Sequence, residues 1–469
     1  MTSLDQCKNQ FRLFLRDCLP PISQAINSIP SIPKFSVVPS SKPDSYKFVE
    51  EKQPNWWQLP KELKQTLFSS SEGQALIALL ERTPPFSHTI GKEIFLSDRG
   101  MSKTYDSGIV LASEILVSYL FAAGVGRWKP TIFDRVWRDC VSYYDPEDNI
   151  VEYFLYAPIA FRLGITKQLD LGDGLAIRRL RNDEVARLAS LNPALAGVLV
   201  GHRFTLWTTT FFVKRCEFEK HIVNKESTQW GLLQNSLNQW VSRLNEEVAI
   251  LRSLLNEALA VPTYAFIRDG YPRDPLGGPP TSLPWRVNFR PFDNPPSRRE
   301  LTNYTKRRAK FLELQGERGW ENVAASMRRY AIAWENPFRA DILADIGAAL
   351  ENLVVQSDRE VSYKFRLRTA HFLEKTATKR QDIIRDLNVA YSYRSNVFHG
   401  GFVFDNPGEY ETATRMKPSK KKLGKGGNPF HDVNEVHRLI YAVSDYYRRI
   451  LKTMIDHELM EIDWTTFGL

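Results

Sequence analysis

An arginine and a histidine five positions apart, Arg394 and His399, lie in the stretch YSYRSNVFHGG at residues 391–401. Arginine is a permanent cation, and its planar guanidinium donates paired hydrogen bonds to phosphoryl oxygens. Histidine titrates near neutral pH, so it can take a proton from a ribose 2′-hydroxyl or give one to a 5′ leaving oxygen. No acidic cluster of the kind that binds Mg²⁺ accompanies the pair. The two residues are therefore candidates for cleaving RNA phosphodiester bonds, and we expect no metal and no cofactor.

The helix predicted over residues 379–399 places Arg394 at or beside its apolar face. With about 100° per residue, an arc of about 140° includes the arginine and several apolar side chains. These side chains are Leu387, Ala390, Tyr393, Val397 and Phe398. A buried guanidinium is destabilising unless it is paired or solvated in a cleft. We expect Glu351, in the helix predicted over residues 338–356, to be its partner.

His399 follows Arg394 by about 140° around the helix axis, so the two side chains diverge on a straight helix. The glycines at 400 and 401 can end the helix in a left-handed cap and let its last turn deform. Alternatively, a second copy of the helix, related by a two-fold axis, can supply its own arginine and histidine. The same spacing also occurs by chance in many helices, where a histidine before glycine simply caps the C-terminal end.

A loop rich in glycine, proline and lysine follows at residues 407–429. Its lysines include Lys417, Lys420, Lys421, Lys422 and Lys425. Such a group can follow an RNA backbone and lend affinity that falls with salt. It can equally be an exposed loop of solvated charges that contacts nothing.

Three phrases occur in a fixed order in the last third of the chain: LENL at 350–353, SYKFRLRTA at 362–370 and YSYRSNVFHG at 391–400. In this order they resemble the ApeA-type subgroup of HEPN domains, whose signature is an arginine and a histidine separated by four to six residues. The resemblance covers about 150 residues. The ordered set of phrases is specific, whereas the arginine–histidine spacing alone is weak.

The resemblance implies a helical bundle that dimerises and acts as a metal-independent ribonuclease in antiviral or toxin systems. It also implies that Arg394 and His399 are catalytic and that Glu351, Ser395 and Asn396 are supporting polar residues. Many active members have Asn, Asp or His directly after the arginine, where this chain has serine.

The helices that carry these residues belong to a region, 298–469, that is predicted to be all-α. A Pro/Gly-rich linker precedes it at 270–298. Apolar periodicity predicts helices near 298–315, 319–335, 338–356, 359–375, 379–399 and 431–459. The expected architecture is thus an α+β N-terminal region followed by an all-α HEPN helical bundle.

Residues 61–297 are predicted to form a mixed α+β domain. Helical patterns occur at 61–82, 105–124, 130–143 and 230–259, and Asn182 is expected to cap a short helix through Leu191. The strand candidates are IVEYFLYAPI, LAIRRL, RFTLWTTTFFVKR and PTYAFIRD. Residues 1–60 are predicted to form a short helix around Phe11–Cys18 and then an extended arm, because its many prolines forbid a long helix.

The overall composition limits the class of protein. A chain of 469 residues fits two or three domains, and its net charge of +9 permits nucleic acid as a partner without requiring it. Four scattered cysteines indicate neither a zinc site nor a disulfide framework and favour a reducing cytoplasm. We see no signal peptide. The apolar stretch 108–126 contains Glu114, so we interpret it as a buried helix and expect no membrane association.

The N-terminal part offers fewer signals. The phrase LDLGDGLAIRRLRNDEVARL at 169–188 is similar to sequences that precede ApeA-type HEPN domains. This region could sense a viral or phage trigger and restrain the nuclease, or it could be a scaffold that stabilises the dimer. We therefore expect a cytoplasmic, homodimeric ribonuclease that cleaves tRNA or another structured RNA in an antiviral response. Two alternatives remain: an inactive HEPN module that binds RNA or a nucleotide, and a dimerisation scaffold for a protein-binding N-terminal domain.

Overall fold

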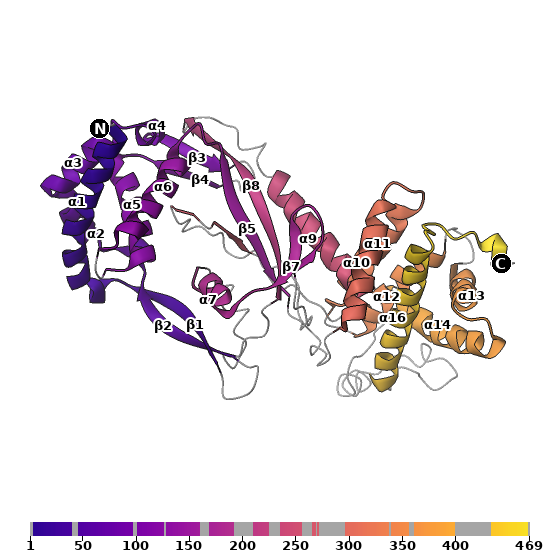
Figure 1. The fold of residues 1–469 in the computed structure, drawn as a ribbon. Helices are drawn as coiled ribbons and strands as arrows, with labels where there is room; N and C mark the ends of the chain where they lie inside the picture. The colour runs from indigo at the N-terminus through magenta and orange to yellow at the C-terminus, as the bar shows by residue number, and fades with distance from the viewer. Residues whose placement is uncertain are drawn as a thin grey trace. The chain divides into compact units, whose positions relative to one another are not determined.

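The chain divides into two compact units in a computed structural model (Figure 1). The N-terminal unit comprises Met1–Ile159, Ile165–Ser242 and Thr263–Leu283, and the helical unit comprises Ala160–Gly164, Arg243–Pro262 and Pro284–Leu469. The structure describes residues 3–39, 46–96, 101–125, 128–159, 168–191, 210–224, 235–255, 265–268, 270–271, 296–336, 339–355, 361–398 and 433–467.

The N-terminal unit has a helical core that begins with the first helix. Its helices are α1 (Ser3–Gln24), α2 (Lys61–Ser69), α3 (Ser71–Leu80), α4 (Phe86–Thr89), α5 (Gly108–Ala123) and α6 (Pro130–Tyr144). The short helix predicted around Phe11–Cys18 is thus a helix of 22 residues, and Pro20 and Pro21 lie inside its last turns. Its buried face extends from Cys7 to Ile22, so packing along the whole helix outweighs the loss of two N–H donors near its end.

The remaining prolines of the first 60 residues flank or belong to a hairpin that the sequence does not predict. Strand β1 (Ser31–Pro39) pairs antiparallel with β2 (Tyr46–Pro54), between the short 3-10 turns η1 (Ile26–Ser28) and η2 (Trp56–Gln58). The chain is extended here, as predicted, but it forms a ladder. A two-stranded hairpin tolerates proline because each strand has a free edge whose N–H groups need no partner.

The second layer of the N-terminal unit is an antiparallel sheet with strand order β4-β3-β8-β5-β9, in which β7 also pairs with β8 and β6 with β7. Its strands are β3 (Lys92–Leu96), β4 (Met101–Tyr105), β5 (Ile150–Pro158), β6 (Leu169–Asp170), β7 (Leu175–Arg179), β8 (Thr210–Asn224) and β9 (Ala265–Ile267). Burial alternates along β5, as expected for a strand with one face on the core. Helix α7 (Asn182–Leu191) confirms the predicted short helix.

Helix α5 corresponds to the apolar stretch that was expected to be a buried helix. Most of its residues are buried, and Glu114 accepts a hydrogen bond of 2.6 Å from the hydroxyl of Tyr144. Within the described part of the chain, no helix has the length and apolar character needed to cross a membrane. The four cysteines are free and buried.

The helical unit contains the predicted series of helices. They are α10 (Arg298–Glu313), α11 (Trp320–Ala333), α12 (Arg339–Val354), α13 (Val361–Leu373), α14 (Ala377–Phe398) and α16 (Val433–Asp456), with a 3-10 turn η6 (Trp464–Phe467). Helix α9 (Asn235–Leu254) contributes its residues from Arg243 onward, which the sequence assigns to the preceding domain. The coarse prediction of an α+β N-terminal region and a helical C-terminal region is therefore confirmed. The HEPN type of the bundle stays a prediction.

Local sequence explains where several of these helices begin. Ser297 caps α10, since its side chain accepts from the backbone of Glu300 while the carboxylate of Glu300 accepts from the Ser297 N–H. Gly319, before α11, has φ +88°, and a Cβ there would approach the carbonyl oxygen of Met460 to 2.5 Å. Only glycine combines that backbone conformation with so close a neighbour.

Candidate active site at the end of helix α14

The predicted site residues lie at the end of α14. Arg394, Ser395 and Asn396 belong to the helix, which ends at Phe398, and the structure describes their backbone only. His399 and the two glycines after it lie outside the described residues, and so do Lys417, Lys420, Lys421, Lys422 and Lys425. The catalytic pairing of Arg394 with His399 therefore stays a prediction.

The backbone of α14 remains helical through position 394. The buried face of α14 is formed by Ile383, Asp386, Leu387 and Ala390. The helix continues from Ala390 to Phe398, so the 3.6-residue repeat returns position 394 to this inward face. Position 399, one residue beyond the helix, would follow at about 140° from it if the helix continued.

An ion pair between α14 and α16 fixes the rotation of α14. Asp386 is only 5% exposed and accepts hydrogen bonds from Arg438 at 2.9 Å and from the hydroxyl of Tyr446 at 2.8 Å. Burial and the neighbouring Asp386 carboxylate raise the pKa of Tyr446, which therefore remains a donor at neutral pH. The sequence analysis missed Asp386, although an acidic residue between Ile383 and Leu387 on an apolar face indicates a buried partner.

Helix α13 holds α14 from another side. Arg366 donates to the backbone carbonyl of Ser362 at 2.9 Å and to the side-chain oxygen of Asn388 on α14. One turn further along α14, the ring of Tyr391 lies 6.3 Å from that of Phe365. These contacts lie just before the arginine–histidine motif, so α13 positions the helix segment that carries it.

Helix α12 completes this group. It packs against both α13 and α14, and the guanidinium of Arg368 on α13 donates to the Val354 carbonyl at its C-terminal end at 3.1 Å. Glu351, the expected partner of Arg394, lies in the last turn of α12 and is half-buried. The ion pair between these two residues stays a prediction. The fold thus brings the helices of Glu351 and Arg394 into contact.

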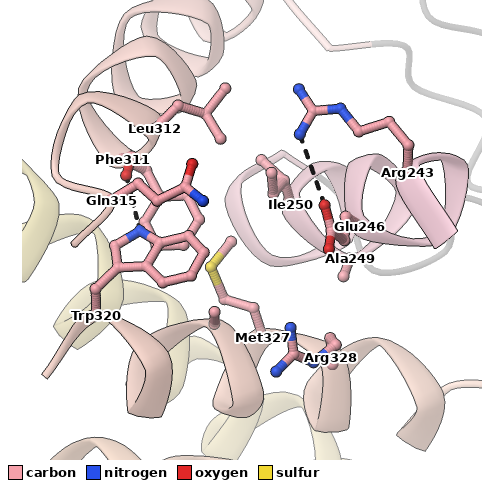
Figure 2. Close-up of a pocket in the computed structure, with 11 residues that line it drawn as sticks. Arg243, Glu246, Ala249, Ile250, Phe311, Leu312, Gln315, Trp320, Met327 and Arg328 are labelled. Carbon is pink, nitrogen blue, oxygen red and sulfur yellow. Dashed lines mark hydrogen bonds and ion pairs between the residues drawn. The ribbon is translucent and has the colours of Figure 1, made fainter. Parts of the chain in front are cut away.

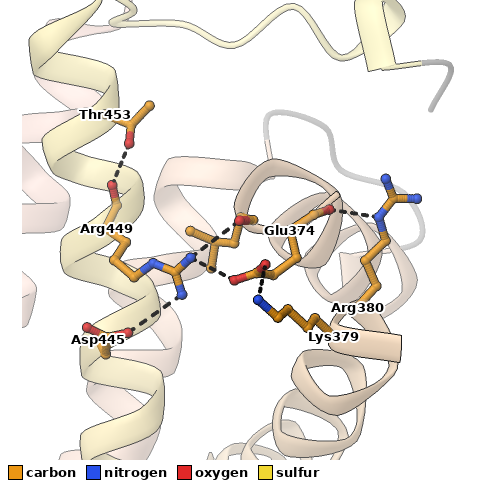
Figure 3. A network of polar contacts seen from close by, with 7 residues as sticks. Glu374, Lys379, Arg380, Asp445, Arg449 and Thr453 are labelled. Carbon is orange, nitrogen blue, oxygen red and sulfur yellow. Dashed lines mark hydrogen bonds and ion pairs between the residues drawn. The ribbon is translucent and has the colours of Figure 1, made fainter. Parts of the chain in front are cut away.

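The opposite end of α14 begins in a polar network (Figure 3). Glu374 accepts from Arg449 of α16 at 2.8 Å and lies 3.9 Å from Lys379. The hydrogen bond from Arg449 lowers the pKa of the Glu374 carboxyl, which therefore stays ionised. Arg380 donates through Nε to the backbone carbonyl of Glu374 at 2.8 Å. The start of the helix and its segment from Asp386 to Tyr391 are therefore held by side chains of neighbouring helices.

A separate pocket lies among α9, α10 and α11 (Figure 2). Its volume is about 70 Å³, which holds a few water molecules, whereas typical small-molecule sites have several hundred Å³. Its lining is largely apolar and includes Ile250, Phe311, Trp320 and Met327. The indole N–H of Trp320 donates a hydrogen bond of 3.0 Å to the Phe311 carbonyl. No histidine, serine or cysteine lines it. This pocket contains none of the residues that the sequence analysis proposes for phosphodiester cleavage.

Comparison with known proteins does not identify a relative of this chain. No family model, no curated protein and no solved structure matches the chain. Among the residues that the structure describes, no group of three or more His, Cys, Asp or Glu side chains is arranged to hold a metal ion.

Proposed function

We propose that this chain is a metal-independent endoribonuclease whose helical unit is a HEPN-type bundle. One observation carries the proposal. LENL and SYKFRLRTA lie on α12 and α13, and YSYRSNVFHG lies on α14 as far as Phe398; these three helices pack against one another. Phrases that are separated in sequence but share one packed group of helices are what a common site requires.

The proposed chemistry is attack of a ribose 2′-oxygen on the neighbouring phosphorus. His399 takes the proton of the 2′-hydroxyl, the new P–O2′ bond forms and the P–O5′ bond breaks. A second histidine, supplied by the two-fold-related chain of a homodimer, protonates the departing 5′-oxygen. The products are a 2′,3′-cyclic phosphate and a 5′-hydroxyl. Arg394 donates to the non-bridging oxygens, whose negative charge grows in the transition state.

The remaining site residues have supporting roles in this proposal. Glu351 orients the guanidinium of Arg394 from α12, and Ser395 and Asn396 contribute polar groups beside it. The inward face on which position 394 lies supports this arrangement, because an arginine there needs a carboxylate partner or access to a phosphate. The lysines at 417–425 add affinity for the RNA backbone.

The N-terminal unit is proposed to sense a viral or phage trigger and to restrain the nuclease until then. The substrate would be tRNA or another structured RNA, and the protein would act in the cytoplasm during antiviral defence. If the unit is only a scaffold for the dimer, its removal or substitution would change dimer stability without changing the response to infection.

The test compares RNA cleavage by the wild-type chain with cleavage by Arg394→Ala and His399→Ala. Arg299→Ala is the matched control, since Arg299 is an exposed arginine of α10 and lies outside both α13 and α14. We expect both site variants to lose cleavage and the control to retain it. Cleavage that persists in His399→Ala would overturn the proposed mechanism. If RNA remains intact when the wild-type protein is incubated with it and with the trigger, the proposal that the chain is a ribonuclease would be overturned.

The same samples separate the two alternatives. An RNA- or nucleotide-binding module would retain RNA in a salt-dependent manner but cleave none of it. A dimerisation scaffold would remain a dimer and retain no RNA even at low salt. Either result would replace the nuclease proposal.

A further inference from the structure

Three arginines of α13 and α14 are held by neutral groups. Arg366 donates to the Ser362 carbonyl and the Asn388 amide oxygen, and Arg368 donates to the Val354 carbonyl. Arg380 donates to the Glu374 carbonyl. Within the described part of the chain, none of the three forms an ion pair with a carboxylate. Each guanidinium is therefore fixed in place while its charge remains uncompensated.

The hairpin formed by α13 and α14, residues 361–392, has an excess of positive charge as a whole. It contains seven Lys/Arg and three Asp/Glu residues. All three acidic residues already have basic partners: Glu374 pairs with Arg449, Asp382 with Arg385, and Asp386 with Arg438. The acidic side chains are thus satisfied by partners that do not include Arg366, Arg368 or Arg380, and these three arginines remain available to an external anion.

The fixed arginines retain donors for such an anion. Arg380 uses Nε on the Glu374 carbonyl, and Figure 3 shows its other two nitrogens directed away from the network. The guanidinium of Arg368 lies 4.9 Å from the ring centre of Trp464, which holds it against that side chain. An arginine that is already ordered loses little conformational entropy when it binds a phosphate. These side chains are therefore better suited to binding than mobile surface lysines.

The spread of the cations indicates a polyanion rather than a single ion. From Arg366 to Leu373, where α13 ends, the helix extends about 10 Å at 1.5 Å per residue, and Lys375 and Arg380 add further charges after it. We propose that this hairpin binds the phosphodiester backbone of RNA outside the site at the end of α14. The inference rests on the proposed function, in which RNA is the substrate, and it names a second part of the substrate-binding surface.

The test measures RNA affinity without cleavage, in the full chain carrying His399→Ala. The hairpin variant adds Lys375→Gln and Arg380→Gln, and the matched control adds Arg299→Gln and Lys306→Gln, two exposed cations of α10. The probe is a labelled single-stranded RNA oligonucleotide, titrated over a series of NaCl concentrations. Both variants remove two positive charges, so a general charge effect would change both equally.

We expect the hairpin variant to lose about tenfold in affinity near physiological salt. Its slope of log K against log salt should decrease by about 1.4, at 0.7 per phosphate contact on a single strand, while the control changes little. Equal losses of RNA affinity in both variants, or no loss in the hairpin variant, would overturn the proposal that the hairpin binds RNA. A hairpin variant that keeps RNA affinity but loses affinity for poly-glutamate would assign the surface to an acidic protein instead.

A second variant excludes a folding artefact. Lys375→Gln with Lys379→Gln breaks no hydrogen bond to the backbone, and it should lower RNA affinity in the same direction. This binding assay does not depend on catalysis. If the wild type cleaves no RNA but the hairpin variant binds it less well, the surface stands and the nuclease proposal fails. If the wild type cleaves RNA and the hairpin variant binds RNA normally, the nuclease proposal stands and the proposed binding surface fails.

Discussion

Arginines are used in opposite ways in two regions of the helical unit. Around α9, α10 and α11 they are buried and paired with carboxylates: Arg308 with Glu247 at 2.8 and 2.5 Å, and Arg252 with Glu335 at 2.8 Å. On the α13–α14 hairpin three arginines, Arg366, Arg368 and Arg380, are partly exposed and held by carbonyl and amide oxygens. In the first region the opposite charges cancel, and the ion pairs connect neighbouring helices. In the second the charges are fixed but not cancelled, which suits binding of an anion.

The largest expected effect is in the first region. Glu247 is fully buried and accepts from both Arg308 and Arg243, so Glu247→Ala leaves a buried guanidinium without its carboxylate. We expect a loss of about 3–5 kcal/mol in the free energy of unfolding, measured by urea denaturation. The neighbouring Glu246→Ala removes a partly exposed pair with Arg243 and should cost less than about 1 kcal/mol. Equal effects of the two substitutions would contradict the comparison.

The second prediction concerns pH. Burial raises the pKa of Glu335 to about 7, against the opposing attraction of Arg252. Below its usual pKa of about 4.3 the Glu335 carboxyl is protonated in both the folded and the unfolded protein. Between about pH 4.3 and pH 7 the folded protein binds more protons than the unfolded protein does. Stability from this group is therefore lost as pH rises through that window. Relative to Glu335→Gln, the wild type should lose about 2 kcal/mol between pH 4.5 and 8, after allowance for solvent screening.

The measurement is the unfolding free energy of both proteins across this range. Glu335→Gln keeps an oxygen that can accept from Arg252 but cannot titrate. Groups elsewhere in the chain titrate equally in the two proteins, so only their difference matters. Parallel curves for the wild type and the variant would show that folding does not raise the pKa of Glu335.

A smaller effect is expected where α13 contacts α14. Asn388→Ala removes the acceptor of Arg366, which is still bonded to Ser362 and has solvent access. The unfolding free energy should fall by about 1 kcal/mol. Because Asn388 lies less than two turns before Arg394, RNA cleavage should fall more than stability does. Gln381→Ala, at an exposed position of the same helix, is the control, and an equal loss of cleavage there would remove the positioning role of Asn388.

The smallest effect should be on the hairpin surface. Lys379 lies 3.9 Å from Glu374 and is 69% exposed, so its pairing adds little to folding. Lys379→Gln should change the unfolding free energy by no more than about 0.5 kcal/mol. Thermal unfolding checks this, and a large loss would mean that the hairpin cations are structural, as they are around α9.

The helices were predictable because their apolar residues repeat at helical spacing and the ends carry local signals. In α10, for example, Ser297 and Glu300 form a capping box, a local sequence pattern that marks the start of a helix. The β1–β2 hairpin was not predictable, since prolines at positions such as Pro33 indicate only an extended chain and do not reveal which strand it pairs with. In α1, a long buried stripe overrode Pro20 and Pro21. Local signals thus identified elements, whereas tertiary packing decided their extent and partners.

The candidate site was predictable in one part only. The spacing and the ordered phrases point to α14, whereas the orientation of Arg394 stays a prediction. The residues that hold α14 could not be predicted as pairs: Asp386 with Arg438, 52 positions apart, and Arg366 with Asn388, 22 positions apart. Such pairings depend on how the helices pack, and a single sequence does not specify which distant residues come into contact.

The most direct test of the central claim is the chemistry of the RNA ends. Wild-type protein and the His399→Ala variant are incubated with RNA in the presence of EDTA, and the termini of the products are identified. The account predicts fragments with 2′,3′-cyclic phosphate and 5′-hydroxyl ends from the wild type and none from the variant. Fragments with 5′-phosphate ends, or cleavage that EDTA abolishes, would contradict it.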